Sequence, residues 1–243
     1  MKTGRNVLIT GAAGGMGSEF VSRFLANGDT VLATDLPDAL DRLGKKHSNP
    51  QLRTFAADLA SEDQCVQLAE VARSNGRIDV LINCAGYFPM TPFESTSLAE
   101  WRKIVDVNLT SMFLLTRLIL PLMKGYGWGR IINIGSASVF EGVPEQVPYV
   151  AAKAGVLGFT RSLAREIGGE GITVNAVAPG LTLTPPVRET MPRSIVDSQI
   201  QSRAIQREEL AKDIVGTVFF LSSPDADFIS GQTITVDGGR HMQ

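Results

Sequence analysis

Short apolar runs alternate with segments of helical periodicity along most of the chain. The apolar runs, each long enough for a buried strand, span residues 6–10, 30–34, 51–55, 77–82, 130–135, 172–177 and 232–236. Apolar residues recur with helical spacing over residues 18–27, 62–75, 98–107 and 109–124, and in a segment that begins at Tyr149. Strands that alternate with helices predict an α/β fold in which a parallel sheet is covered on both faces. No repeat or linker interrupts the pattern, so we expect one doubly wound domain over residues 1–243.

The composition suits a globular protein and gives no sign of a charged partner. The chain has 243 residues, of which 44% are hydrophobic, and a formal net charge of -2. We therefore expect neither nucleic acid nor a membrane among its partners. The first apolar stretch, Val7 to Ile9, is too short for a signal peptide or a membrane span, which makes the cytoplasm the expected location. Cys65 and Cys84 alone form neither a disulfide framework nor a zinc site, so no metal is expected.

A glycine-rich loop, Gly11 to Gly17, lies between the first predicted strand and the first predicted helix. Glycines here permit a tight turn, let a pyrophosphate approach the backbone, and leave N–H groups at the helix N-terminus to bind it. The spacing Gly11-x-x-x-Gly15-x-Gly17 differs from the common Gly-x-Gly-x-x-Gly, and a tight turn without a ligand would also need glycines. The order strand, loop, helix, strand and acid favours dinucleotide binding.

Asp35 ends the second predicted strand, 24 residues after Gly11. A carboxylate at this place accepts hydrogen bonds from the hydroxyls of the adenosine ribose, whereas the 2′-phosphate of NADP would meet like charge. The next residue, Leu36, is not basic, so we expect NAD as the cofactor. An Arg42 or Lys45 side chain that folds back onto this site would weaken the argument, and a solvated turn acid is the alternative interpretation of Asp35.

Three polar residues form the candidate catalytic group. Ser136 follows the apolar run 130–135 and is expected at a strand end, while Tyr149 and Lys153 lie four residues apart and share one helix face. A cation near the phenol favours the phenolate, so Tyr149 is suited to act as a general base on an alcohol or a general acid on a ketone. Ser136 is placed to hydrogen-bond the same substrate oxygen. Taken alone, the Tyr–Lys spacing is also typical of a surface pair.

Taken together, these motifs resemble those of the short-chain dehydrogenase/reductase family over essentially the whole chain. The motifs that carry the resemblance are, in chain order, Thr10-Gly11-x-x-x-Gly15-x-Gly17, Asn83-Cys84-Ala85-Gly86, Asn108, Ser136, Tyr149-x-x-x-Lys153 and Pro179-Gly180. The resemblance implies a Rossmann-type fold with a seven-stranded parallel sheet, a nicotinamide cofactor, and hydride transfer to or from a carbonyl carbon.

The resemblance also implies roles for individual residues. Tyr149 would be the proton donor or acceptor, and Ser136 would orient the substrate oxygen. Lys153 would bind the nicotinamide ribose and favour the phenolate, and Asn108 would hold a water that links Lys153 to solvent. The implied cofactor-binding residues are Gly11, Gly15, Met16 and Gly17 at the pyrophosphate, Asp35 at the ribose, Asp58 and Leu59 at the adenine, Asn83, Ala85 and Gly86 beside them, Tyr149 and Lys153 on the nicotinamide side, and Pro179, Gly180, Thr182 and Thr184 at the carboxamide.

Two positions depart from the simplest assignment. Cys84 stands where the family usually has a second asparagine, which puts the local hydrogen bonding in doubt more than the chemistry. Ser138 is a rival to Ser136, but it lies eleven residues before Tyr149 and fits the family spacing less well. We expect Ser138 to line the substrate pocket.

The substrate pocket is expected to have mostly apolar walls. The residues predicted to contact substrate are Phe88, Ser136, Ser138, Phe140, Gln146 and Tyr149. Residues 183–205 are predicted to form a mobile lid whose arginines are a solvated face. Residues 87–93 and 127–130 look like those of bacterial members that oxidise aromatic alcohols, and residues 101–109 look like those of members acting on pyridoxal.

We therefore expect NAD-dependent oxidation of a small cyclic or aromatic alcohol, or reduction of the ketone. The alternatives are a 3-oxoacyl-thioester reductase, which should prefer NADPH, and a non-catalytic dinucleotide sensor, which would usually lack Tyr149 or Lys153. A nucleotide-sugar epimerase would normally be longer and have a different glycine spacing. Apolar and small residues on several faces of the helices after Asn108 and Tyr149, together with the resemblance, indicate a homodimer or a homotetramer.

Overall fold

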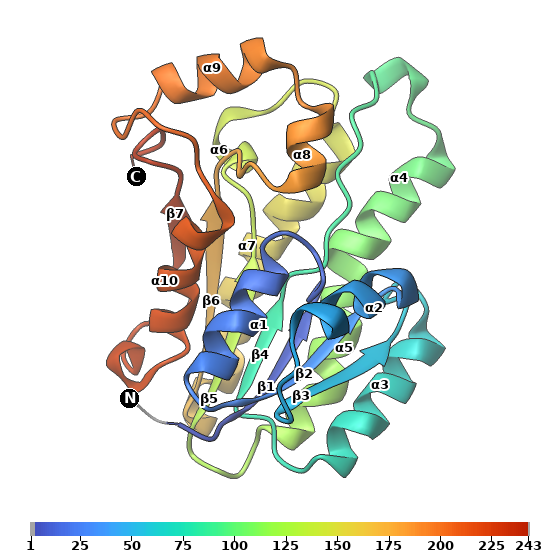
Figure 1. Cartoon of the computed structure of the whole chain (residues 1–243), viewed down its shortest axis with the longest axis vertical. Helices are drawn as coiled ribbons and strands as arrows, with labels where there is room; N and C mark the ends of the chain where they lie inside the picture. The colour runs from blue at the N-terminus through green and yellow to red at the C-terminus, as the bar shows by residue number, and fades with distance from the viewer. Residues whose placement is uncertain (1–2, 243) are drawn as a thin grey trace.

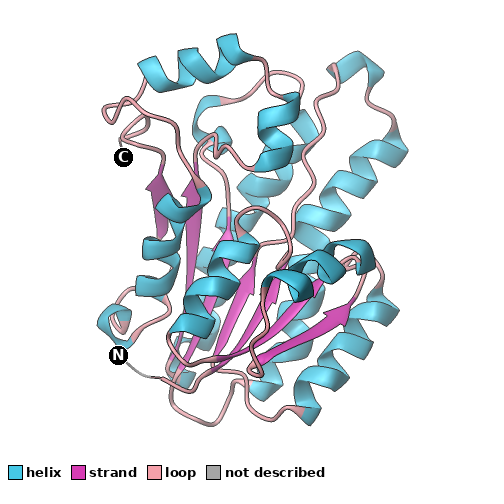
Figure 2. Cartoon of the chain, in the orientation of Figure 1, coloured by secondary structure: helices cyan, strands magenta, loops and turns pink. Residues whose placement is uncertain are grey.

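The structure, a computed structural model, describes residues 3–242 and is built around one parallel sheet (Figures 1 and 2). The sheet has seven strands in the order β3-β2-β1-β4-β5-β6-β7. The strands are β1 (Asn6–Thr10), β2 (Thr30–Asp35), β3 (Leu52–Ala56), β4 (Val80–Asn83), β5 (Gly129–Ile134), β6 (Ile172–Pro179) and β7 (Thr233–Val236). Every neighbouring pair is parallel. The predicted seven-stranded, Rossmann-type parallel sheet is thus confirmed.

Helices cover both faces of this sheet. They are α1 (Gly17–Ala26), α2 (Pro37–Lys46), α3 (Glu62–Ser74), α4 (Leu98–Val105), α5 (Ser111–Ile119), α6 (Ser138–Glu141), α7 (Val147–Ile167), α8 (Pro185–Thr190), α9 (Arg193–Gln201) and α10 (Ala211–Leu221). Short 3-10 turns span Phe93–Ser95, Leu120–Leu122, Gly168–Glu170 and Pro224–Ala226. The sequence pattern did not predict α2 and α10. The two helices predicted over 98–107 and 109–124 are joined by a π-helical turn at Asp106–Thr110.

Two apolar cores lie on opposite faces of the sheet, because successive residues of a strand point to opposite sides. Val7 and Ile9 of β1 belong to the core that α1, α2 and α10 cover, whereas Leu8 belongs to the core that α3, α5 and α7 cover. Both sets of side chains are almost completely buried, as expected for strands with helices on both sides.

The segment 98–122 is long and apolar enough to cross a membrane by composition alone, with a mean hydropathy of 1.4. In the fold this segment comprises α4, the π-helical turn, α5 and a 3-10 turn. Leu115 and Ile119 of α5 are fully buried in the core beside α3. The apolar composition of α5 is thus explained by its packing on the sheet.

The strand order places a topological switch point between β1 and β4. From β1 the chain proceeds to β2 and β3 on one side, then returns to β4 and continues outward on the other side. Ligands of doubly wound sheets bind beyond the carboxyl ends of the strands at such a point. Figure 1 shows α6, α8 and α9 gathered beyond this edge of the sheet.

Candidate active site

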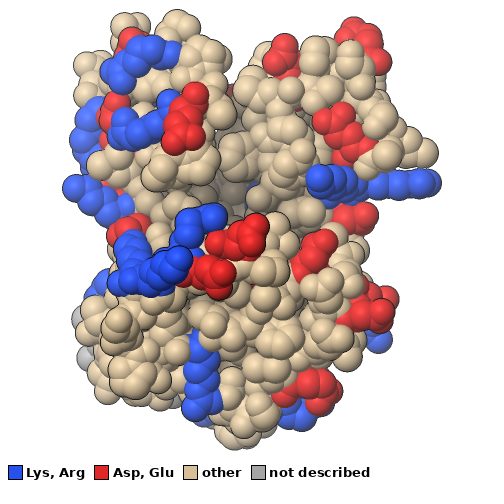
Figure 3. All heavy atoms as spheres, turned by 45° about the vertical axis from the view of Figure 1, so that its right-hand side comes forward, with Lys and Arg blue, Asp and Glu red and all other residues tan. Residues whose placement is uncertain are grey.

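A cavity of about 1140 Å³ opens at the carboxyl ends of the strands. Figure 3 shows a hollow between two projecting parts of the molecule, where most surrounding atoms belong to uncharged residues. The predicted site residues that line the cavity are Gly11, Gly15, Met16, Gly17, Asp35, Asp58, Leu59, Ala85, Gly86, Phe88, Ser136, Ser138, Gln146, Tyr149, Lys153, Pro179, Gly180, Thr182 and Thr184. The volume lies slightly above the range typical of sites for one small ligand, which leaves room for a ligand as large as a dinucleotide.

The glycine-rich loop is packed so closely that side chains have no room. A Cβ atom at Gly11 would lie 2.8 Å from Ala85 Cα, and one at Gly17 would overlap the Gly11 carbonyl oxygen. A Cβ atom at Gly15 would likewise overlap the Thr184 side chain across the cavity. No side chain caps the first turn of α1, which leaves backbone N–H groups for an anion. The loop therefore fits the pyrophosphate of a dinucleotide.

The Asp35 carboxylate lies at the opposite end of the loop, where β2 ends. Its Oδ2 accepts a hydrogen bond from Ala13 N over 2.9 Å, and its Oδ1 accepts one from Leu36 N over 2.8 Å. These bonds hold the carboxylate against the loop. Arg42 Nη1 donates to the Asp38 carbonyl instead of turning to Asp35, and Lys45 is exposed. The described residues thus place no arginine or lysine beside this carboxylate.

Ser136, Ser138 and Tyr149 meet at one wall of the cavity. Ser136 follows β5, and its Oγ shares a hydrogen bond with Ser138 Oγ over 2.8 Å and accepts one from Ser138 N over 3.2 Å. Ser136 also hydrogen-bonds the Tyr149 phenol from α7. The Phe88 ring lies 6.0 Å from the Tyr149 ring, centroid to centroid. Two hydroxyl groups and a phenol therefore face the same space beside an aromatic wall.

Lys153 lies beneath Tyr149 on the same face of α7. Its Nζ donates to the Ile134 carbonyl over 2.8 Å and lies 5.8 Å from the centroid of the Tyr149 ring. Burial lowers the pKa of Lys153 to about 8. Burial raises the pKa of Tyr149, and the Ser136 hydrogen bond opposes this rise. In the protein alone, burial therefore outweighs the contacts that favour the phenolate.

Asn108 and Asn83 face a second, small cavity behind the first. This cavity has a volume of about 10 Å³, close to that of one water, and Lys153 also lines it. Asn108 lies in the π-helical turn, where its Nδ2 donates to the Tyr87 and Ile104 carbonyls. Asn83 Nδ2 donates to Thr116 Oγ1 and Asn133 Oδ1 in the core. Neither asparagine lines the large cavity, and the Asn108 placement suits a water beside Lys153.

Cys84 does not disturb the backbone that follows β4. Thr10 Oγ1 accepts hydrogen bonds from the backbone N–H groups of Cys84 and Ala85, over 2.9 and 3.1 Å. Burial raises the pKa of the Cys84 thiol to about 12, which makes it a poor nucleophile. The local hydrogen bonding that the missing asparagine put in doubt is thus supplied by Thr10.

Phe140 does not line the cavity, contrary to the sequence-based expectation. The one-turn helix α6 presents Ser138 and Glu141 to the cavity, whereas Phe140 packs against Val156 and Leu157 on the other side. The Phe140 ring also lies 6.2 Å from the His241 ring, centroid to centroid.

Charged residues near the C-terminus complete the cavity, and sequence reasoning missed them. Asp237 accepts hydrogen bonds from the backbone N–H groups of Gly239, Arg240 and His241, which turns the chain back over the cavity. Arg240 Nη2 then pairs with Glu141 Oε2 over 2.6 Å. The sequence Asp237-Gly238-Gly239 indicates a turn, but the neighbouring sequence does not indicate which part of the molecule that turn approaches.

Residues 183–205 cover the cavity with α8 and α9. Val187, Met191 and Ile195 line the cavity from this segment. Arg188 and Arg193 are exposed and pair with Glu208, as expected for a solvated face. Arg203 is only 4% exposed, so that expectation is wrong for this arginine. Among residues 3–242, no cluster of His, Cys, Asp and Glu suits a metal ion.

Comparison with known proteins agrees with this geometry. Residues 11–241 match a family model described as enoyl-(acyl carrier protein) reductase. The chain is 37% identical to a 3-oxoacyl-[acyl-carrier-protein] reductase of Synechocystis sp., over 99% of this chain and 98% of that protein. Among solved structures, a short-chain dehydrogenase/reductase from Brucella melitensis matches with a TM-score of 0.93 and 31% identity, over 99% of this chain and 98% of that one. Levodione reductase matches with a TM-score of 0.92 and 32% identity, over the same shares of the two chains. The chain therefore belongs to the short-chain dehydrogenase/reductase family of nicotinamide-dependent oxidoreductases.

Proposed function

We propose that the protein is an NAD(H)-dependent oxidoreductase acting on a small cyclic or aromatic alcohol or ketone. The observation that carries this proposal is the meeting of Ser136, Tyr149 and Lys153 in the cavity that the glycine-rich loop also lines. This arrangement has a dinucleotide site and a proton-transfer group within one space.

The protein residues supply placement and proton transfer. When bound, the nicotinamide supplies or accepts the hydride. Ser136 holds the substrate oxygen, with its own hydroxyl oriented by Ser138. Tyr149 gives its proton to that oxygen when a ketone is reduced and takes the proton when an alcohol is oxidised. Lys153 and the small cavity beside Asn108 then connect the phenol to a water and onward to solvent.

Asp35 supports NAD over NADP. Its carboxylate is held at the loop, and among residues 3–242 no arginine or lysine is placed against it, so it is free to accept hydrogen bonds from ribose hydroxyls. The 2′-phosphate of NADP would bring a second negative charge to the same place without a counter-ion.

The walls around Tyr149 support a substrate with a ring. Phe88 stacks at an angle on the Tyr149 ring, and Met90, Val143 and Val187 line the same cavity. Apolar walls with a few convergent polar groups are typical of sites for small organic molecules. The carbinol oxygen would lie at Ser136, and the ring against the apolar wall.

The second candidate is reduction of a 3-oxoacyl thioester, which the similarity to a 3-oxoacyl-[acyl-carrier-protein] reductase favours. This activity would use the same Ser136 and Tyr149 chemistry. It should prefer NADPH and accept acetoacetyl-CoA, whereas the first candidate should prefer NAD and secondary alcohols.

The proposal is tested by following the nicotinamide absorbance with NAD and with NADP against aromatic and alicyclic alcohols, sugars, pyridoxal and, in reverse, acetoacetyl-CoA. We expect turnover with NAD on a ring-containing alcohol. Turnover confined to NADPH and the thioester would establish the second candidate instead. Tight NAD binding without turnover on any substrate would support a sensor.

The matched variant is Tyr149→Phe, which removes only the phenolic hydroxyl. Its turnover should fall by at least roughly 10²- to 10⁴-fold, the usual contribution of a general acid or base. Its Kd for NAD should stay close to that of the wild type. An active Tyr149→Phe protein would exclude Tyr149 as the proton donor.

A further inference from the structure

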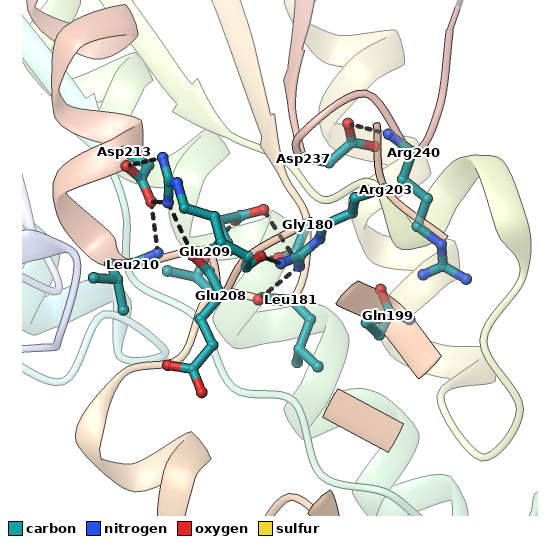
Figure 4. A network of polar contacts seen from close by, with 12 residues as sticks. Gly180, Leu181, Gln199, Arg203, Glu208, Glu209, Leu210, Asp213, Asp237 and Arg240 are labelled. Atoms are coloured by element: carbon teal, nitrogen blue, oxygen red, sulfur yellow. Dashed lines mark hydrogen bonds and ion pairs between the residues drawn. The ribbon is translucent and has the colours of Figure 1, made fainter. Parts of the chain in front are cut away.

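A buried ion pair lies at the edge of the cavity, between the segment after β6 and the segment before α10 (Figure 4). Thr182 Oγ1 donates to Glu209 Oε1 over 2.6 Å, and the two residues are only 7% and 5% exposed. Arg203 Nη2 lies 3.6 Å from Glu209 Oε2 and donates to the Leu181 carbonyl over 3.1 Å. Arg203 Nη1 donates to the Arg207 carbonyl over 2.9 Å. Arg203 thus binds two backbone carbonyls as well as the carboxylate.

The Glu209 side chain is not needed to hold these two segments together. Leu183 N donates to the Glu209 carbonyl over 2.8 Å, and Thr182 and Glu209 form a parallel β-bridge. The charges are, moreover, incompletely satisfied, since Glu209 Oε2 and Arg203 Nε have no hydrogen-bond partner within residues 3–242. A buried carboxylate with such a deficit costs stability. Its presence beside the cavity points to a role in binding.

The hydrogen bond between Thr182 and Glu209 has a fixed direction while the carboxylate is ionised. An ionised carboxylate only accepts hydrogen bonds, so the proton between the two oxygens must belong to Thr182. The carbonyl of Gly180, at 3.5 Å from Thr182 Oγ1, is a much poorer acceptor. With its only proton committed to Glu209, Thr182 offers only lone pairs to a ligand in the cavity that it lines. Thr182 is therefore an acceptor toward that ligand.

We propose that Glu209 is a positioning residue that makes Thr182 an acceptor for the amide N–H of the bound nicotinamide carboxamide. The inference rests on the proposed function, which requires a nicotinamide in this cavity. Arg203 supports the arrangement because its charge favours the ionised carboxylate, and it joins the end of the lid segment, residues 183–205, to the Leu181 carbonyl.

Protonation of Glu209 would relax this arrangement. Burial raises the pKa of Glu209 to about 7, against the hydrogen bond from Thr182 and the charge of Arg203, while Asp237 and Asp213 add to the rise. Above this pH the carboxylate is ionised and Thr182 must donate to it. Below this pH the acid carries its own proton and can donate to Thr182, so the hydroxyl proton is free to turn. Affinity for the amide should therefore weaken as the pH falls through about 7.

The test compares NAD with 3-acetylpyridine adenine dinucleotide, in which a methyl ketone replaces the amide and no N–H remains. Isothermal titration calorimetry gives the two Kd values and hence the preference for NAD. We expect the wild type to prefer NAD, and Glu209→Gln to reduce that preference roughly three- to tenfold, as expected for one hydrogen bond. The glutamine amide of this variant can donate as well as accept, so Thr182 loses its fixed direction. The Kd of the acetyl analogue should change little.

Thr182→Val and Glu70→Gln are the matched variants. Thr182→Val keeps the shape of the side chain and should lose the same preference, even if Glu209→Gln does not fold. Glu70→Gln makes the same chemical change in an exposed pair with Arg73 on α3 and should behave like the wild type. A loss of preference in Thr182→Val but not in Glu209→Gln would overturn the positioning role. An unchanged preference in both variants would overturn the contact with Thr182 as well.

The pH dependence separates this role from a purely structural one. In the wild type, the preference for NAD should fall as the pH is lowered through a midpoint at about 7, the pKa of Glu209. In Glu209→Gln the preference should not change over this range, and a persisting midpoint would overturn the inference. Absence of a nicotinamide site would look different, because the wild type would then bind neither dinucleotide. Failure of the catalytic part of the proposed function alone would leave both Kd values measurable and would appear only as missing turnover.

Discussion

Burial raises the pKa of the Tyr149 phenol, and the hydrogen bond to Ser136 opposes the rise only in part. The protein alone therefore keeps Tyr149 protonated at neutral pH, which is the form that donates a proton to a ketone. Lys153, with a pKa of about 8, is also still charged there. The unliganded site therefore holds Tyr149 in the protonated form that ketone reduction needs, whereas alcohol oxidation requires that the phenol first lose its proton.

This difference predicts different pH profiles for the two directions of the reaction. For ketone reduction, kcat/KM should be flat below about pH 8, because Tyr149 and Lys153 both keep their protons there. For alcohol oxidation, kcat/KM should rise with pH over the same range, because the phenolate is the base. Steady-state rates at constant ionic strength measure both. A reduction rate that rose with pH would show that another group donates the proton.

Asp35 offers a second prediction for a single residue. Asp35→Asn keeps an oxygen that can accept from Ala13 N but removes the charge that opposes a 2′-phosphate. The ratio of the Kd for NADP to the Kd for NAD should fall by roughly tenfold or more, as expected for removing one close like charge. Calorimetric titration measures both constants. Asp38→Asn, an exposed acid on α2, is the control, and an equal effect there would refute the assignment.

The helices show where the apolar pattern is informative and where it is not. The strands could be predicted from the sequence because they are buried under helices on both faces, and strands buried in this way are apolar along their whole length. In α10, by contrast, the sequence from Ala211 to Leu221 is apolar on most faces, so periodicity cannot distinguish a helix from a buried strand. In α2 only Leu40 and Leu43 are buried, which is too few to form a pattern. The π-helical turn around Asn108 joins α4 to α5, and the spacing of apolar residues along the sequence does not indicate it.

Two glycines in helices should respond in opposite ways to replacement by alanine. Gly44 lies exposed within α2, and a Cβ atom there would have no neighbour within 4 Å, so Gly44→Ala should raise the free energy of unfolding by roughly 0.5 to 1 kcal/mol. At Gly17 the added Cβ atom would overlap the Gly11 carbonyl oxygen. Gly17→Ala should therefore lower stability by roughly 1 to 3 kcal/mol and weaken NAD binding. Urea unfolding and calorimetry measure these effects, and a neutral Gly17→Ala would contradict the packing of the loop.

The arrangement of the whole chain explains which parts of the site could be predicted. Ser136 and Gly86 were readable because each follows a strand, and the parallel sheet brings its carboxyl ends to one edge. Arg240 lines the same cavity, and Glu209 lies behind it against Thr182. Both come from distant parts of the sequence, and their burial or pairing depends on tertiary contacts alone. The prediction that Phe140 lines the cavity was wrong because the direction in which each side chain of a one-turn helix points depends on the residues that pack against the helix.

The exposed aromatic side chains lead to a prediction about assembly. Trp101 on α4 and Phe113 on α5 are exposed by 37% and 45%, beside the helix face that the sequence pattern and the family resemblance assign to a subunit interface. Phe228, which precedes β7, is also fully exposed. Large exposed apolar side chains are enriched in such interfaces.

We expect sedimentation velocity at micromolar concentration to show a homotetramer or a homodimer. Phe113→Asp should shift the distribution toward smaller species, because a carboxylate in an apolar interface loses its hydration without gaining a partner. If the assembly is a tetramer with two kinds of interface, Phe228→Asp should reduce it to a dimer and leave the Phe113 contact intact. A wild-type protein that sediments only as a monomer would refute this assembly while leaving the site within each chain unaffected.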